Sequence, residues 1–415
     1  MQGIKRLKFA CYTTNLTMSV VGNISPILFL TLRRLYGISY TLLGLLVLVN
    51  FVTQLSVDLV FSFFSHKFNM EKTVRSTPVL AFFGLLIYAA APWIFGSAPY
   101  VGLLLGTVVF SAAGGLGEVL ISPVIAACPT EDPDREMSKL HSVYAFGTVG
   151  VVLIATVFLL LFRATSWQWL VLSLSVVPLI SSLLFSRAEI PLMETPARAS
   201  GAVRFLKNPT LWLCVVAIFL GGAAECTMAQ WCSGYLELAV RIPKVWGDIF
   251  GVAAFSLMLG MGRWLYSKYG KRVETVLLLG AVGATVCYFV AAVCRVPLLG
   301  LAACALTGLC VSMLWPGCLV VASERIPSGG VFLYAMMAAG GDLGASIAPQ
   351  LVGSITDAAM QNPHMVALSA DLGITAEQCG MRVGMLTGAI FPLLAVVVYA
   401  YLVKTAKHMA RNGAA

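Results

Sequence analysis

The sequence predicts an all-α integral membrane protein with twelve transmembrane helices in two bundles of six. Hydrophobic residues make up 59% of the 415 residues, and charged residues only 11%. The mean hydropathy is +0.90. A water-soluble domain could not hide so much apolar surface, because its exterior needs a polar coat. Lipid must therefore surround most of the chain.

Twelve apolar runs are long enough to cross a bilayer, which takes about 20 helical residues. Short polar gaps separate them, with longer gaps at 187–208 and 361–382. We therefore expect an N-terminal six-helix bundle over 1–186, a cytoplasmic central loop over 187–208 and a C-terminal six-helix bundle over 209–415. The expected spans are approximately 9–32, 39–64, 78–96, 99–127, 142–162, 167–186, 209–235, 246–267, 273–294, 297–320, 330–358 and 383–403.

The first and the last of the expected spans are each preceded by a local sequence signal. The first span follows Lys5, Arg6 and Lys8, as a signal peptide would. It is longer than the apolar core of a signal peptide and lacks a small-residue cleavage site, so we interpret it as an uncleaved span. Before the last span, Thr375-Ala-Glu-Gln378 has the pattern of a capping box. That pattern would start the last helix early.

Lys and Arg are distributed unevenly over the gaps. If both termini lie inside, nineteen fall on the inner side and seven in outer loops. Cytoplasmic loops retain positive charge, so we expect a multi-pass cell-membrane protein with both termini in the cytoplasm. The net charge of +9 comes without a basic patch interleaved with aromatic residues, which excludes a nucleic-acid partner.

The 11 cysteines do not indicate a disulfide framework. Several lie inside apolar runs, where cysteine behaves as a small hydrophobic residue. The chain has no CxxC pair and no His/Cys cluster with metal-ligand spacing. We therefore expect no metal site and no cofactor.

The two halves of the sequence repeat three features in the same order. Gly115-Leu116 with Pro123 matches Gly308-Leu309 with Pro316. Asp58 and Arg263 occupy matching places before basic loops, and Tyr144-Ala matches Tyr334-Ala. The series indicates a duplicated six-span unit, the parallel repeat of one class of transporter.

Polar residues recur at helical spacing inside four spans. Steps of three or four residues place each set on one face of its helix. Such a face either bonds to a neighbouring helix or lines a water-filled cavity, and for the Ser and Asn members both readings stay open. The sets are Asn15, Ser19 and Asn23; Asn50, Gln54 and Asp58; Ser111, Gly115, Glu118 and Ser122; and Asp342, Ser346, Gln350 and Ser354.

Glu118 lies near the middle of the fourth span, after Gly114, Gly115 and Gly117. An ionised carboxylate there costs on the order of 3 kcal/mol on insertion scales. Loss of water favours the protonated acid, so Glu118 could load and release a proton as its surroundings alternate. The alternative is a permanently protonated glutamate bonded to a backbone carbonyl.

Glu225 is the comparable acid of the seventh span, with Gln230 and Trp231 close behind it. An acceptor, an amide and an aromatic ring together suit a hydroxylated ligand. Tryptophan is also a common interface anchor, so Trp231 and Trp315 have two readings. We predict Glu118 and Glu225 as proton-coupling residues and Asp58, Arg263 and Asp342 as gating residues. The predicted substrate-binding residues are Asn23, Asn50, Gln54, Tyr144, Gln230, Trp231 and Trp315.

Taken with the twelve spans, three sequence segments resemble the major facilitator superfamily, nearest to its fucose–proton symporter branch. They are Gly-Leu-Gly-Glu118-Val-Leu-Ile-Ser-Pro123, Leu140-His-Ser-Val-Tyr-Ala-Phe-Gly147 and Gly340-Gly-Asp-Leu-Gly-Ala-Ser-Ile-Ala-Pro349. The resemblance implies alternating access by two rocking bundles, with Glu118 as a candidate proton carrier.

The sequence thus predicts a secondary transporter for a small organic solute such as a sugar, coupled to protons and acting as a monomer in the bilayer. An efflux antiporter for drugs or metabolites is the alternative, favoured by Met313, Met336 and Met337 in the late spans. A non-transporting membrane sensor is the alternative of another class, since a fold does not fix a function. We expect no enzyme, because the spans hold no HExxH motif and no GxSxG motif in a suitable setting.

Overall fold

The computed structural model describes residues 2–64, 67–126, 128, 133–191, 206–326 and 330–412. These residues are helical almost throughout and contain no strand. They form two compact units. Unit 1 comprises Met1–Ile38 and Val49–Ser200, and unit 2 comprises Ser39–Leu48 and Gly201–Ala415. Helix α2 therefore begins in unit 2 and continues in unit 1.

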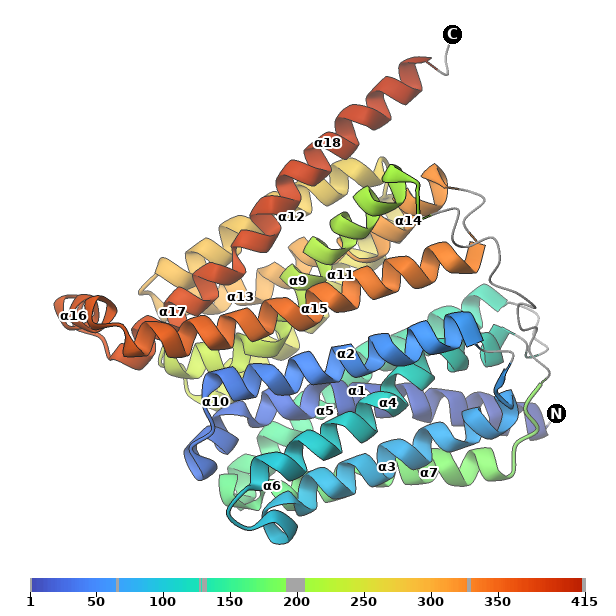
Figure 1. Cartoon of the computed structure of the whole chain (residues 1–415), viewed down its shortest axis with the longest axis horizontal. Helices are drawn as coiled ribbons and strands as arrows, with labels where there is room; N and C mark the ends of the chain where they lie inside the picture. The colour runs from blue at the N-terminus through green and yellow to red at the C-terminus, as the bar shows by residue number, and fades with distance from the viewer. Residues whose placement is uncertain are drawn as a thin grey trace. The chain divides into compact units, whose positions relative to one another are not determined.

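In unit 1 the helices follow one another with short connections (Figure 1). Helices α3 and α4 pack closely, and α1 packs against α4, α5 and α7. A break at Ser175 divides the expected sixth span into α6 and α7. The helices are α1 (Gln2–Tyr36), α2 (Tyr40–Phe64, shared with unit 2), α3 (Met70–Phe95), α4 (Pro99–Ala126), α5 (Pro133–Phe162), the short turn η2 (Ala164–Ser166), α6 (Trp167–Leu174) and α7 (Val176–Ser186).

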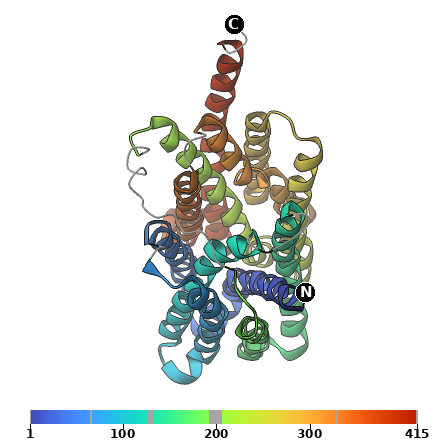
Figure 2. The ribbon, with the colours of Figure 1, turned by 90° about the vertical axis from the view of Figure 1, so that its right-hand side faces the viewer.

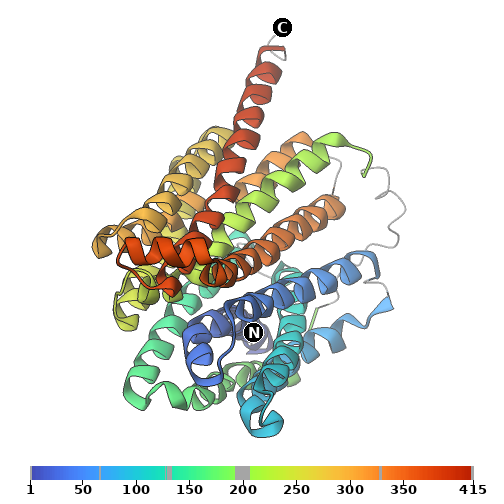
Figure 3. The same cartoon turned by 60° about the vertical axis from the view of Figure 1, so that its left-hand side comes forward.

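In unit 2, α9 packs against α15, and α13 lies beside α11 and α12. Helix α18 extends beyond the other helices of this unit (Figure 2), and α16 lies at the turn between α15 and α17 (Figure 3). The helices are α9 (Pro209–Leu238), α10 (Lys244–Gly247), the π-helical turn η3 (Asp248–Ala253), α11 (Ala254–Tyr269), α12 (Val273–Val293), α13 (Pro297–Val311), α14 (Pro316–Arg325), α15 (Gly330–Gln361), α16 (Pro363–Asp371), α17 (Ala376–Gly388) and α18 (Ile390–Asn412).

Ten helical stretches among the described residues are long and apolar enough to cross a membrane. The other two expected spans correspond to α5, whose apolar part is Phe146–Phe162, and to α15. The all-helical membrane fold is confirmed, while twelve crossings stay a prediction. The expected central loop lies partly outside the described residues, so the bundle boundaries stay predictions too.

Two local signals explain where helices begin and break. The Thr375 hydroxyl accepts from the Gln378 amide at 3.1 Å, and the Gln378 side chain accepts from the Thr375 amide at 3.1 Å. This confirms the capping box and the early start of α17. In the tenth expected span, α13 ends at Val311 and α14 begins at Pro316, because proline supplies no amide donor to continue the helix.

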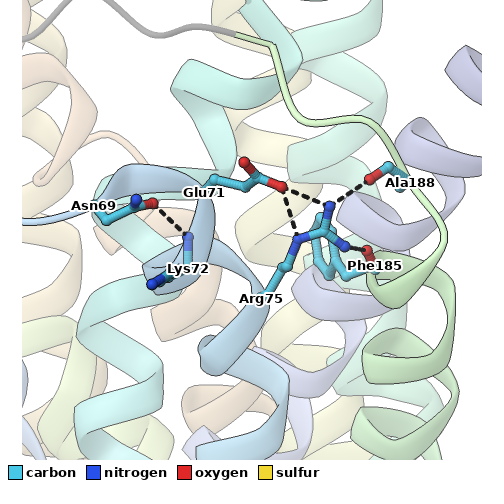
Figure 4. Close-up of polar contacts among 6 residues, drawn as sticks. All are labelled: Asn69, Glu71, Lys72, Arg75, Phe185 and Ala188. Carbon is cyan, nitrogen blue, oxygen red and sulfur yellow. Dashed lines mark hydrogen bonds and ion pairs between the residues drawn. The ribbon is translucent and has the colours of Figure 1, made fainter.

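Arginines hold the end of α7 in unit 1. Arg75 of α3 donates to the carbonyl oxygens of Phe185 and Ala188 and pairs with Glu71 at 2.8 Å (Figure 4). Arg6 of α1 donates to the Arg187 carbonyl at 3.2 Å. Cations are favourable at a helix C-terminus, where carbonyls lack intrahelical partners. Some of the charge that the sequence assigns to the cytoplasmic side thus also joins helix ends.

Candidate functional site

The polar face of α1 is bonded to α5. Asn15 donates to the Leu140 carbonyl at 2.6 Å, and Ser19 donates to the Tyr144 carbonyl at 2.8 Å. Asn23 donates to the Ser19 carbonyl at 2.8 Å and to the Thr148 hydroxyl at 3.4 Å. Of the two readings left open by the sequence, the structure thus supports helix–helix bonding for Asn15 and Ser19. The Tyr144 ring is exposed.

The polar face of α2 meets α4 over small residues. Ser111 donates to the buried Asn50 side-chain oxygen at 2.6 Å. One turn further along, Gln54 lies against Gly114 and Gly115, where an added Cβ would contact it. Glycines allow this close approach because they carry no side chain. The approach places the next turns of the two helices, with Asp58 and Glu118, beside each other.

Asp58 and Glu118 form a pair of carboxyl groups in unit 1. Their carboxyl oxygens lie within 4.8 Å of each other. Asp58 is 5% exposed, whereas Glu118 is an exposed residue. Two carboxylates at this separation repel each other, so sharing one proton between them is favourable. Sequence reasoning assigned them to separate roles, and the structure brings them together.

In unit 2 an ion pair joins α9 to α11. Arg263 Nη2 lies 3.2 Å from Glu225 Oε1. Arg263 Nε also donates to the carbonyl of Ser312 at 3.1 Å. An α-helical amide at position 316 would bond to that carbonyl, but residue 316 is proline and supplies no N–H. The helix break between α13 and α14 therefore creates the acceptor that fixes Arg263.

The candidate tryptophans of unit 2 take part in helix packing. Trp231 is 1% exposed, and its indole N–H donates to the Pro349 carbonyl at 3.0 Å. Trp315 lies against Gly222 and Gly341, which line its ring from α9 and α15. Gln230 is buried, at 8% exposure. This packing favours a structural role for Trp231, while the half-buried Trp315 keeps part of its surface accessible.

Asp342 is buried in α15. The residue before it, Gly341, lies against Gly222, about one turn before Glu225 on α9. Arg263 and Glu225, a gating and the proton-coupling candidate of this unit, are paired directly.

Sequence reasoning missed Asp357 and Glu377. Asp357 accepts from the amides of Tyr40 and Thr41 at 3.3 and 2.6 Å, which caps the first turn of α2. Glu377 accepts from the Tyr40 hydroxyl at 2.8 Å. Asp357 lies three residues after Ser354, so it continues the polar face of α15. Extending that face by one helical step would have identified it.

The described residues of unit 1 offer Asp58 and Glu118 as possible cation ligands.

Comparisons with known proteins identify a family and a fold. A family model described as the Major Facilitator Superfamily matches residues 10–349. No curated protein matches the sequence at a significant level. The solved structures described next are 13–14% identical to this chain, so their similarity shows the fold alone.

Three solved structures illustrate the similarity. The xylose transporter XylE from E. coli in an inward open conformation is 14% identical, with 94% of this chain and 95% of that chain covered and a TM-score of 0.70. The nucleoside transporter NupG is 13% identical, with 97% and 100% covered and a TM-score of 0.69. The transporter FucP in the outward conformation is 14% identical, with 95% and 98% covered and a TM-score of 0.60.

Proposed function

The chain belongs to the Major Facilitator Superfamily of membrane transporters, and from this premise we propose that it carries a small polar organic solute, such as a sugar, together with protons by alternating access. We further propose that it acts as a monomer in the plasma membrane with both termini in the cytoplasm. The family is one of transporters and not of enzymes.

The carboxyl pair of Asp58 and Glu118 carries the proposal. A proton shared by the pair relieves the repulsion between two carboxylates within 4.8 Å. Glu118 is the more exposed of the two side chains, whereas Asp58 is 5% exposed, so we assign proton exchange with water to Glu118. A change in the hydration of this pair would alter its proton affinity, which is the requirement for coupling.

The similar structures support the solute class without fixing it. They include a xylose transporter and a nucleoside transporter, which are proteins that carry polar organic solutes. The efflux alternative depended partly on Met313, Met336 and Met337. Met313 and Met337 are 6% and 0% exposed and pack inside the protein, so only the half-buried Met336 keeps apolar surface accessible.

Uptake into proteoliposomes tests the proposal. Purified protein is reconstituted and an inward proton gradient is imposed. Uptake of labelled xylose and uridine is measured, while a pH-sensitive dye inside the vesicles reports proton entry. We expect accumulation that follows the proton gradient and collapses with a protonophore. Uptake that ignores the pH gradient, or that follows a sodium gradient instead, would contradict proton coupling. Absence of flux for every solute tried would favour the sensor alternative.

The matched variants are Glu118→Gln and Glu71→Gln. Glu71 is 58% exposed and pairs with Arg75 near the start of α3, away from the carboxyl pair. We expect Glu118→Gln to abolish gradient-driven accumulation but to keep exchange of internal for external solute. Glu71→Gln should keep both.

A further inference from the structure

Arg263 presents part of its guanidinium group to solvent. Its side chain is 44% exposed, whereas the side chain of its partner Glu225 is 15% exposed. Arg263 belongs to the candidate membrane span Lys244–Tyr266. Because an ionised guanidinium facing hydrocarbon is costly, its exposed edge faces water rather than lipid.

The orientation of this guanidinium is fixed from one side. Nε–H donates to the Ser312 carbonyl, and Nη2 faces Glu225. Gly262, the preceding residue, lies directly against Ser312, which holds α11 close to the break between α13 and α14. Arginine carries five donors in a planar fork, so the remaining donors point outward in a set direction.

We propose that Arg263 is a receptor for the carboxylate of an organic acid and that Glu225 occupies it when no substrate is bound. This inference rests on the proposed transport function and narrows its substrate to small acids such as sugar acids. The carboxylate of the solute takes the place of the Glu225 carboxylate on the Arg263 guanidinium. The charge balance and the geometry of the ion pair are therefore kept.

The charge count of the site favours a single carboxylate over a phosphate. Arg263 is the cation paired with Glu225, and Asp342 is a second acid of this unit, on the helix α15 that packs against α9. A phosphate dianion would bring two negative charges to one cation and two acids. A carboxylate brings one negative charge, and the displaced Glu225 removes one negative charge by taking up a proton.

The proton balance at Glu225 is one for one. The substrate carboxylate binds Arg263, Glu225 leaves it, and Glu225 accepts a proton from the aqueous side to become a neutral acid. Among the described residues of unit 2, Arg263 of α11 pairs with Glu225, and the Tyr288 hydroxyl of α12 donates to the Ala224 carbonyl at 2.7 Å. Cys226 on α9 and Asp342 on α15 are the other titratable groups considered at this turn. Together with the proton of the Asp58–Glu118 pair, a monoanion would enter with two protons and one net positive charge.

The experiment compares acids with their neutral amides on the full-length purified protein. Gluconate, glucuronate and lactate are each paired with the corresponding amide, and glucose serves as a neutral sugar. Thermal stabilisation and proteoliposome uptake are measured for all of them. We expect the acids to stabilise the protein and to enter with two protons each, while the amides do neither.

The variants separate a receptor from a structural ion pair. Arg263→Gln should lower acid uptake by about 10-fold or more, since it removes the charge-assisted hydrogen bonds that a guanidinium makes to a carboxylate. Glu225→Gln should bind acids several-fold more tightly, because the internal competitor is gone, but lose proton-driven accumulation. Lys268→Gln, an exposed charge on the same helix, should change neither.

The double variant Glu225→Gln with Arg263→Gln decides between the two roles. If the pair is structural, removing both charges restores acid uptake, which overturns the inference. If Arg263 binds the substrate, the double variant stays inactive toward acids. Uptake of glucose without any acid overturns the inference but leaves the proposed transport function intact. No uptake of acids, amides or glucose overturns both.

Discussion

The carboxylate of Asp357 accepts hydrogen bonds from both the amide and the hydroxyl of Thr41, at 2.6 and 2.7 Å. The two residues are 316 positions apart in the chain. The first amides of a helix have no intrahelical acceptor, so Asp357 of α15 caps Tyr40 and Thr41, while the local Ser39 hydroxyl accepts from the Leu42 amide at 3.2 Å. The Gln350 amide adds a bond to the Thr41 carbonyl at 3.3 Å.

Removing this cap should loosen the start of α2. We expect Asp357→Ala to lower the free energy of unfolding by about 1–2 kcal/mol, the range of lost helix caps. Amide hydrogen exchange at Tyr40 and Thr41 should speed up, which mass spectrometry of the corresponding peptide can measure. Asp357→Asn keeps one acceptor oxygen. Its stability and its amide exchange rates should lie between those of Asp357→Ala and of the unchanged protein. Equal exchange in Asp357→Ala and the unchanged protein would show that the cap contributes nothing.

From the carboxyl pair of unit 1 we predict the effect of changing Asp58, its buried member. Asp58→Asn removes the repulsion that favours a shared proton, so Glu118 should bind its proton less tightly. Proton-driven uptake should then reach its maximum at a lower pH than in the unchanged protein, as measured by initial rates across a pH series. An unchanged pH profile would mean that Asp58 does not act on Glu118.

From the helix break at Pro316 we predict how replacing this proline affects the hydrogen bond of Arg263. Pro316→Ala supplies the missing amide, which would bond to the Ser312 carbonyl and compete with Arg263 Nε. We expect a several-fold increase in KM for acid uptake with little change in kcat. Pro297→Ala is the matched control, because Pro297 is at the first position of α13, where an amide has no intrahelical partner.

Two glycines of unit 2 should respond to alanine with opposite signs. A Cβ on Gly222 would lie 2.9 Å from the Trp315 ring, so Gly222→Ala should destabilise the protein by about 1–3 kcal/mol. A Cβ on Gly260 meets nothing within 4 Å, and Gly260→Ala should stabilise α11 by about 0.5–1 kcal/mol. Thermal unfolding in detergent would rank the two variants, and destabilisation of equal size in both would argue against tight packing at Trp315.

The helices were predictable from the sequence because lipid imposes one requirement on every span. An apolar run of about 20 residues meets it alone, without knowledge of its neighbours. The capping box at Thr375 was predictable for the same reason, since both of its bonds lie within four residues. Where two spans fell short, α5 and α15, polar residues interrupt the apolar pattern.

The partners of the polar residues were not predictable to the same degree. Helical spacing gives the face on which a residue lies, but not the rotation or depth of the helix that meets it. Glu225 and Arg263 were therefore assigned to different roles, although the structure pairs them at 3.2 Å. The bond from Arg263 to Ser312 could have been anticipated in part, because Pro316 leaves the carbonyl four residues earlier without its donor.

Helix α2 is one continuous rod of 25 residues, about 37 Å long, that starts in one unit and ends in the other. It contains no proline, and its one glycine, Gly44, lies in the part that belongs to unit 2. A rod of this kind resists bending, since sharp kinks occur mainly at such residues. The Asp357 cap therefore holds one end of a stiff element, and a disturbance at Tyr40 or Thr41 would be passed along the helix rather than absorbed by a kink.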